Sequence, residues 1–178
     1  MRAVPITVTA LASALLLTAC SSGGDDGGSG DTGSKAADKA AGSACAFGEL
    51  SQEVGPVDAA PAAGDTGNVT VTLTNKGAEC TLDGFPAVDL HAGKASATVE
   101  KAAGAEAQKL TVPEQGTFTF TITYVRGDGG DGLAVKTVEY GLPGSDKTES
   151  FPWSYGEVAL KSGNVPDASV TAFQQAGD

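Results

Sequence analysis

Histidine, methionine and tryptophan are scarce in this chain of 178 residues, which has one of each. A serine triad needs a histidine as its base, so His91 would have to serve. The chain contains neither a G-x-S-x-G nucleophile elbow nor an S-x-x-K pattern. We therefore interpret His91, which precedes a turn at Ala92-Gly93, as a surface histidine rather than a catalytic one.

Soft metal ligands are equally scarce. The single methionine is Met1, so a copper site would lack thioether ligands. Calcium takes about six to eight oxygens, and the glycine-rich run 127–132 supplies only the carboxylates of Asp128 and Asp131. We interpret that run as a hairpin loop. The sequence predicts neither a metal nor a cofactor.

Basic residues are few, with 11 Lys and Arg against 22 Asp and Glu and a net charge of −11. Such a chain is repelled by nucleic acid and by anionic headgroups, so neither is an expected partner. The many acids leave one enzymatic alternative open, a secreted hydrolase that uses a carboxylate pair. No such pair is marked out by spacing.

The N-terminus carries an apolar stretch from Val4 to Leu17, shorter than the ~20 residues that cross a bilayer. It ends in Leu17-Thr18-Ala19-Cys20, which resembles a lipobox, the cleavage and lipidation signal of bacterial lipoproteins. We predict that residues 1–19 are a signal peptide and that Cys20 carries a diacylglyceryl group, with acyl chains such as palmitate. The alternative is an ordinary secretory signal with a chance cysteine.

A low-complexity segment follows the predicted cleavage point. Residues 21–43 consist mainly of Gly, Ser, Asp, Ala and Lys, with no aromatic and no large aliphatic side chain. Segment 20–43 is therefore predicted to be a disordered tether, spanning roughly 25–28 Å as a coil. Together with the lipid, it places the protein outside the cytoplasm, anchored to the outer face of the cell membrane.

Residues 44–178 form the predicted folded domain, and their hydrophobic pattern has a period of two. Apolar side chains alternate with threonine in the runs GNVTVTLTN (67–75) and GTFTFTITY (116–124), which is typical of antiparallel strands with one buried face. Segment 133–142 predicts another strand, with a bulge at Lys136-Thr137. Weaker strands are expected over 45–54, 85–91, 95–101, 107–112, 156–161 and 167–173. The one helix candidate is Lys101–Lys109, and the whole pattern favours an all-β sandwich.

Aromatic residues make up only 6% of the chain, so the run from Phe151 to Tyr155 is conspicuous. Phe151, Trp153 and Tyr155 would project from one face of a strand. Facing inward, they would form a core cluster, which we favour because scarce aromatics usually go where burial is available. Facing outward, they would form a platform for a sugar or peptide ligand.

Three cysteines occur, and Cys45 and Cys80 remain once Cys20 is acylated. Two thiols in one small extracytoplasmic domain usually pair. We predict a Cys45–Cys80 disulfide, with free thiols or a metal site as the alternative.

The run GNVTVTLTNKGAECTLDGFPAVDLHAG (67–93) resembles the domain-of-unknown-function family DUF4232 of actinobacterial secreted proteins and lipoproteins. The matching elements are Leu73-Thr74-Asn75 with Gly77, Cys80-Thr81-Leu82, Gly84-Phe85-Pro86, Val88, Leu90, Cys45 and Gly116-Thr117-Phe118. The resemblance covers most of 44–178 and is looser after Asp128. It implies an immunoglobulin-like antiparallel β-sandwich and no established activity.

The expected role is a non-enzymatic binding or interaction module of the cell envelope. Its expected partners are the membrane, through Cys20, and an unidentified envelope protein or glycan.

Overall fold

The computed structural model describes residues 42–55 and 61–176. The predicted signal peptide, the predicted lipidation site Cys20 and most of the predicted tether lie outside these described residues. The first strand, β1 (Ser43–Ala44), pairs in parallel with β4, Ser43 opposite Cys80. The strand therefore begins one residue before the boundary predicted for the domain.

The larger of two main sheets has the strand order β2-β3-β9-β14-β7, with β15 also paired to β9. All of its pairs are antiparallel except β7 with β14. The strands are β2 (Leu50–Val54), β3 (Thr66–Asn75), β7 (Glu100–Lys101), β9 (Thr117–Val125), β14 (Ala168–Val170) and β15 (Gln174–Gln175).

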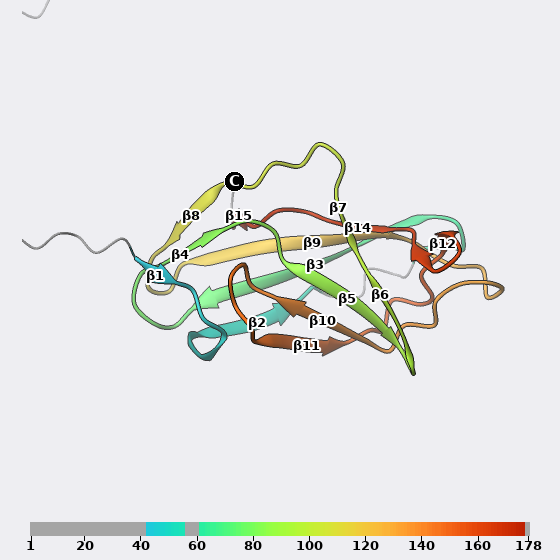
Figure 1. Cartoon of the computed structure of the whole chain (residues 1–178), viewed down its shortest axis with the longest axis horizontal. Helices are drawn as coiled ribbons and strands as arrows, with labels where there is room; N and C mark the ends of the chain where they lie inside the picture. Colours follow the sequence, from blue (N-terminus) through green and yellow to red (C-terminus); the bar gives the residue numbers. More distant parts are fainter. Residues whose placement is uncertain (1–41, 56–60, 177–178) are drawn as a thin grey trace, which may run out of the picture. The chain divides into compact units, whose positions relative to one another are not determined.

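The second main sheet is antiparallel and has the order β11-β10-β5-β6. Its strands are β5 (Ala87–Ala92), β6 (Ala95–Thr98), β10 (Thr137–Gly141) and β11 (Thr148–Pro152). Two small sheets complete the domain (Figure 1). One joins β1, β4 (Cys80–Asp83) and β8 (Lys109–Val112), and the other joins β12 (Leu160–Ser162) and β13 (Val165–Pro166).

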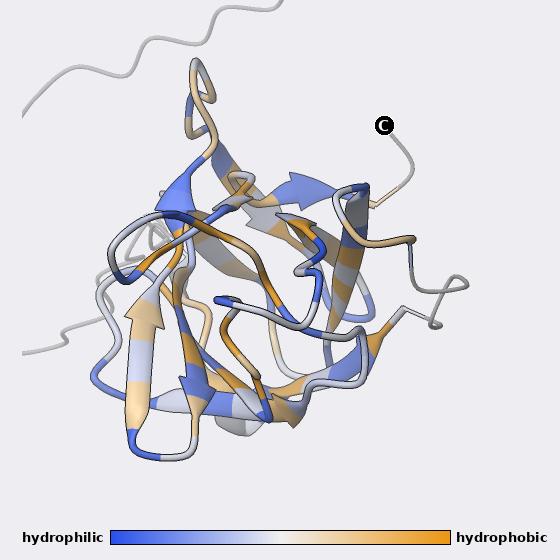
Figure 2. Cartoon of the chain, turned by 90° about the vertical axis from the view of Figure 1, so that its right-hand side faces the viewer, coloured by the Kyte–Doolittle hydropathy of each residue, from blue (hydrophilic) through white to orange (hydrophobic). Residues whose placement is uncertain are grey.

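The longest strands, β3 and β9, follow the alternation of their sequences. They pair from Thr66 opposite Val125 to Thr74 opposite Thr117. Their apolar residues point inward, and their threonines, except the exposed Thr66, are half-buried on the outer face, which gives the striped strands of Figure 2. On that outer face the hydroxyls of Thr70 and Thr121 lie 3.0 Å apart. A period of two therefore places one face of each strand in the core.

The core lies between the two main sheets and is held by aromatic contacts across them. Phe120 of β9 packs against Tyr140 of β10, with ring centroids 5.2 Å apart. Phe47, in the single turn of 3-10 helix at Phe47–Glu49, meets the same tyrosine edge-on at 5.5 Å. The predicted all-β architecture with antiparallel sheets is confirmed for the described domain.

The predicted helix and the predicted start of the first strand are wrong. The helix candidate Lys101–Lys109 contains the end of β7, an irregular stretch and the start of β8, with no helix. An Ala-rich segment without an apolar stripe has nothing to pack against a core, so helix propensity does not decide its structure. The strand expected over 45–54 starts only at Leu50, after the 3-10 turn at Phe47–Glu49.

The run 127–132 is not a hairpin loop, because the strands on its two sides do not pair with each other. β9 belongs to the larger sheet and β10 to the second sheet, so the run crosses from one sheet to the other. The phase slip at Lys136-Thr137 is likewise no bulge within a strand. β10 starts at Thr137, while Leu133 forms a separate bridge with Val158.

Candidate functional site

The aromatic run 151–155, which begins at the end of β11, is part of the core. Phe151, Trp153 and Tyr155 are 3%, 7% and 5% exposed. The Trp153 ring meets Tyr124 at 4.9 Å and Tyr155 at 4.8 Å between centroids, both edge-on. Its indole N–H donates to the Gly156 carbonyl at 2.6 Å. The core alternative therefore describes this cluster, and no ring is presented outward as a ligand platform.

The predicted disulfide is present and joins Cys45 to Cys80. Both residues are buried, at 4% and 2% exposure. The bridge links the segment after β1 to the start of β4, and the Cys45 amide also donates to the Thr81 carbonyl at 3.0 Å. The N-terminal end of the domain is thus tied down covalently and by backbone pairing.

His91 and a pair of carboxylates lie on the outer face of the second sheet. His91 stands opposite Thr137 of β10 and Ser96 of β6, and its Nε2 is buried without a partner among the described residues. Asp89 stands directly opposite Glu139 and accepts a hydrogen bond from the Thr98 hydroxyl at 2.6 Å. Neither acid lines the two hollows described next, and the hydrolase alternative stays a prediction.

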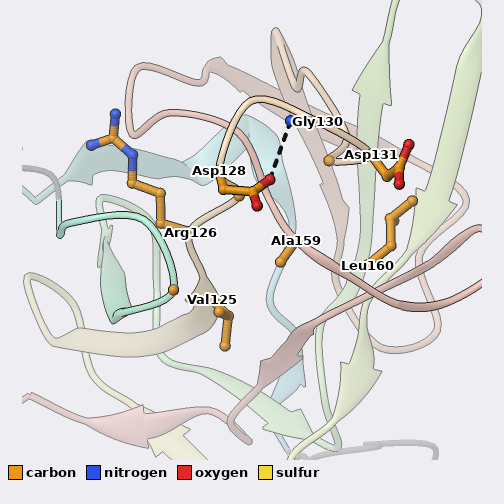
Figure 3. A pocket seen from close by; sticks show the side chains of 10 residues that line it. Val125, Arg126, Asp128, Gly130, Asp131, Ala159 and Leu160 are labelled. Atoms are coloured by element: carbon orange, nitrogen blue, oxygen red, sulfur yellow. Dashed lines mark hydrogen bonds between the residues drawn. The ribbon is translucent and has the colours of Figure 1, made fainter.

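Two hollows meet at one end of the sandwich, on either side of the backbone from Arg126 to Asp128. The first has a volume of about 360 Å³ and is lined by the glycine-rich run together with Arg126 and Leu160. Figure 3 shows this hollow, in which Asp128 turns back to accept a hydrogen bond from the Gly130 amide at 3.1 Å. In the same view the Arg126 side chain points away from Asp131 and Leu160.

The second hollow has a volume of about 520 Å³ and is also lined by Arg126. Its walls carry small residues of segment 61–63 together with Gly129 and Gly156, and two acids, Asp128 and Glu157. The Arg126 guanidinium donates from Nη1 to the Pro61 carbonyl at 3.0 Å. This second hollow is called the Arg126 hollow below.

Charges of both signs line the Arg126 hollow. The Oε2 atom of Glu157 is buried without a hydrogen-bond partner among the described residues, and Asp128 is exposed. Within residues 42–55 and 61–176, no group of three or more His, Cys, Asp or Glu side chains is arranged to hold a metal ion. The arrangement suits recognition of a polar ligand through a cation and nearby acceptors.

All three tyrosines of the chain are buried, and burial is the main cause that raises the pKa of each phenol above its usual value of 10.0. For Tyr124, the nearby Arg126 partly offsets this by lowering the pKa. For Tyr140, the Glu149 carboxylate adds to the rise in pKa. A buried phenol resists ionisation because its charged form loses solvation.

We expect the folded protein to show little phenolate absorbance up to about pH 10, the usual phenol pKa. A raised folded-state pKa contributes stability that is complete below the unfolded pKa and is lost as pH rises through the folded pKa. The free energy of unfolding should therefore fall from about pH 10 upward. Denaturant titrations across this range should show a shallower fall for Tyr140→Phe. A tyrosine that titrates at its ordinary pKa in the folded chain would contradict this expectation.

Asn75 is a buried polar residue whose role sequence reasoning missed. Its side-chain amide donates to the carbonyls of Ala78 at 2.7 Å and Pro113 at 3.2 Å, and its side-chain oxygen accepts from the Gly77 amide. Its backbone amide donates to the Gly116 carbonyl. Asn75 thereby joins the turn after β3 to the turn before β9.

Arg126 was also missed, although one signal was available in the sequence. It is the only arginine after Arg2, and it directly follows the apolar run of β9. A single arginine in an acidic domain is a candidate for a specific charge contact.

Comparison with known proteins identifies a family and no activity. No curated protein and no solved structure matches the chain significantly. The family model described as "Domain of unknown function (DUF4232)" matches residues 45–174. That range begins at the first disulfide cysteine and ends in β15, so it covers both main sheets except Gln175. The chain belongs to the DUF4232 family.

Proposed function

We propose that this protein is an extracytoplasmic lipoprotein whose sandwich acts as a binding module of the cell envelope, held at the outer face of the membrane through Cys20. The observation that carries the binding role is the Arg126 hollow, where a cation fixed by a backbone carbonyl borders a cavity of about 520 Å³. Ligand sites typically combine such a hollow with a few fixed polar groups.

The anchoring part of the proposal rests on the sequence. The order of apolar stretch, small residues, Cys20 and polar segment is that of a lipoprotein leader. None of the helices in the described part of the chain is long and apolar enough to cross a membrane. Two acyl chains on one cysteine would hold the domain durably at the membrane, because each buried CH₂ contributes about 0.8 kcal/mol.

Substitution of Cys20→Ser is expected to abolish labelling by an alkyne fatty acid and to move the protein from the membrane fraction to the medium. The reason is that serine lacks the thiol that accepts the diacylglyceryl group. The measurement is click detection of the label together with fractionation, with Ser34→Ala as the control within the predicted tether. Full labelling of the Cys20→Ser variant would remove the anchor from the proposal.

The binding role is tested by crosslinking in living cells. The tagged wild-type protein and the Cys20→Ser variant are crosslinked, purified and compared by mass spectrometry. We expect one envelope component to be enriched with the anchored form. If nothing crosslinks specifically to the wild-type protein, and wall glycans also fail to bind the purified domain, the binding role is wrong.

A further inference from the structure

Arg126 is a fixed cation without an acidic partner in the described part of the chain. It is half-buried, and no described carboxylate forms an ion pair with it. The ion pairs found there instead join Lys161 to Glu100 and to Asp167. A cation withdrawn from water is favourable when an anion compensates for the lost solvation. This position is therefore prepared for an anionic ligand.

The Nε–Nη2 edge of a guanidinium can bind a carboxylate through two hydrogen bonds. Nη1 is engaged by the Pro61 carbonyl, while Nε and Nη2 have no acceptor among the described residues. A carboxylate can accept two parallel hydrogen bonds from such an edge. Gly156, with φ of +90°, lies against it, and a Cβ there would come within 3.0 Å of Nε and 3.2 Å of Cζ. Any side chain at this position would therefore crowd the guanidinium, so the close approach of the two residues requires glycine.

The walls of the Arg126 hollow narrow the choice of ligand. Asp128 and Glu157 line it together with Arg126, so an anion that brings no hydrogen-bond donor would meet two acidic residues. A ligand that combines a carboxylate with a nearby N–H group can pair with the cation through the first and with the acidic residues through the second. The remaining wall, formed by Pro61, Ala62 and Ala63, accepts a small apolar group.

We infer that the Arg126 hollow binds the free C-terminal carboxylate of a peptide that ends in a small apolar residue. Such a terminus presents a carboxylate, an amide N–H and a methyl-sized side chain within one residue. The carboxylate lies on the Nε–Nη2 edge of Arg126, and the amide faces Asp128 and Glu157. This inference rests on the proposed binding role and names the ligand class for it.

The test uses two small probes on the purified protein, acetyl-Ala-Ala with a free carboxylate and the same dipeptide as its C-terminal amide. Titration by NMR or calorimetry is expected to show binding of the acid, with the amide at least about tenfold weaker, because hydrogen bonds to charged groups are the stronger ones. Arg126→Gln should weaken binding of the acid by a similar factor, and Arg126→Lys should do so less. Lys147→Gln, which removes an exposed lysine of the turn between β10 and β11, is the matched control.

Three results would overturn the inference. The first is equal affinity for the acid and the amide, and the second is full competition by inorganic phosphate. The third is no binding of the acid at about 10 mM, which would mean a Kd weaker than that concentration. The acid and amide comparison on the wild-type protein needs no substitution, so it stands even if Arg126→Gln unfolds. An envelope partner that crosslinks equally to wild-type and Arg126→Gln protein would reject the carboxylate site and leave the proposed binding role intact.

Discussion

Trp153→Ala is expected to lower the free energy of unfolding by about 3–5 kcal/mol, the range typical of a large aromatic removed from a core. The indole is 7% exposed and touches Tyr124 and Tyr155 edge-on, so alanine would leave a cavity between both rings. It would also leave the Gly156 carbonyl without the indole N–H that it accepts at 2.6 Å. Denaturant unfolding followed by far-ultraviolet circular dichroism measures the change.

Trp153→Phe separates packing from hydrogen bonding, because it keeps most of the ring and removes the N–H donor. We expect a smaller loss, about 1–3 kcal/mol. Val165→Ala, at a position 39% exposed, is the control and should change stability little. If Trp153→Ala were as stable as the wild-type protein, the assignment of this residue to the core would be wrong. The alternative that the aromatic residues form an outward-facing ligand platform would then be favoured.

Loss of the disulfide is the other large expected effect. The double variant Cys45→Ala with Cys80→Ala should lose about 4 kcal/mol, because the bridge closes a loop with a sequence separation of 35 residues in the unfolded chain. For a domain of this size, the midpoint of thermal unfolding should fall by more than about 10 °C. Differential scanning calorimetry of the soluble domain measures the shift.

Reduction provides the control for the disulfide. A reducing agent should lower the midpoint of the wild-type domain to nearly that of the double variant and should leave the double variant unchanged. The two treatments share only the loss of the S–S bond, so agreement between them assigns the effect to the bridge. A wild-type midpoint that does not respond to complete reduction would show that the bridge contributes no stability.

Much of the local structure follows from the chain's own pattern. The alternating threonines and apolar residues of 67–75 and 116–124 predicted the two central strands and their buried faces, because successive side chains of a strand point to opposite sides. The pairing of Cys45 with Cys80 followed from the absence of any other free cysteine after Cys20. The inward placement of Trp153 followed from the scarcity of aromatics.

Which strands pair with one another in the sheets depended on the tertiary structure. The run 127–132 has the composition of a hairpin turn, yet it connects strands of different sheets. The sequence of a strand indicates which of its faces is apolar, but it does not indicate which neighbour it pairs with. Many strands of the domain have edges equally suited to pairing. The choice among them is made by packing of the whole core, which no window of sequence contains.

The Arg126 hollow likewise depends on the tertiary structure and not on any local sequence pattern. Its walls come from the segments around 61–63, 126–129 and 156–157, which are far apart in the sequence and lack any periodic pattern. The sequence by itself determined the two central strands, their buried faces, the disulfide and the order of leader-like segments. Tertiary structure alone decided which loops meet at Arg126, because loop positions are set by the strands that carry them and not by the loops' own residues.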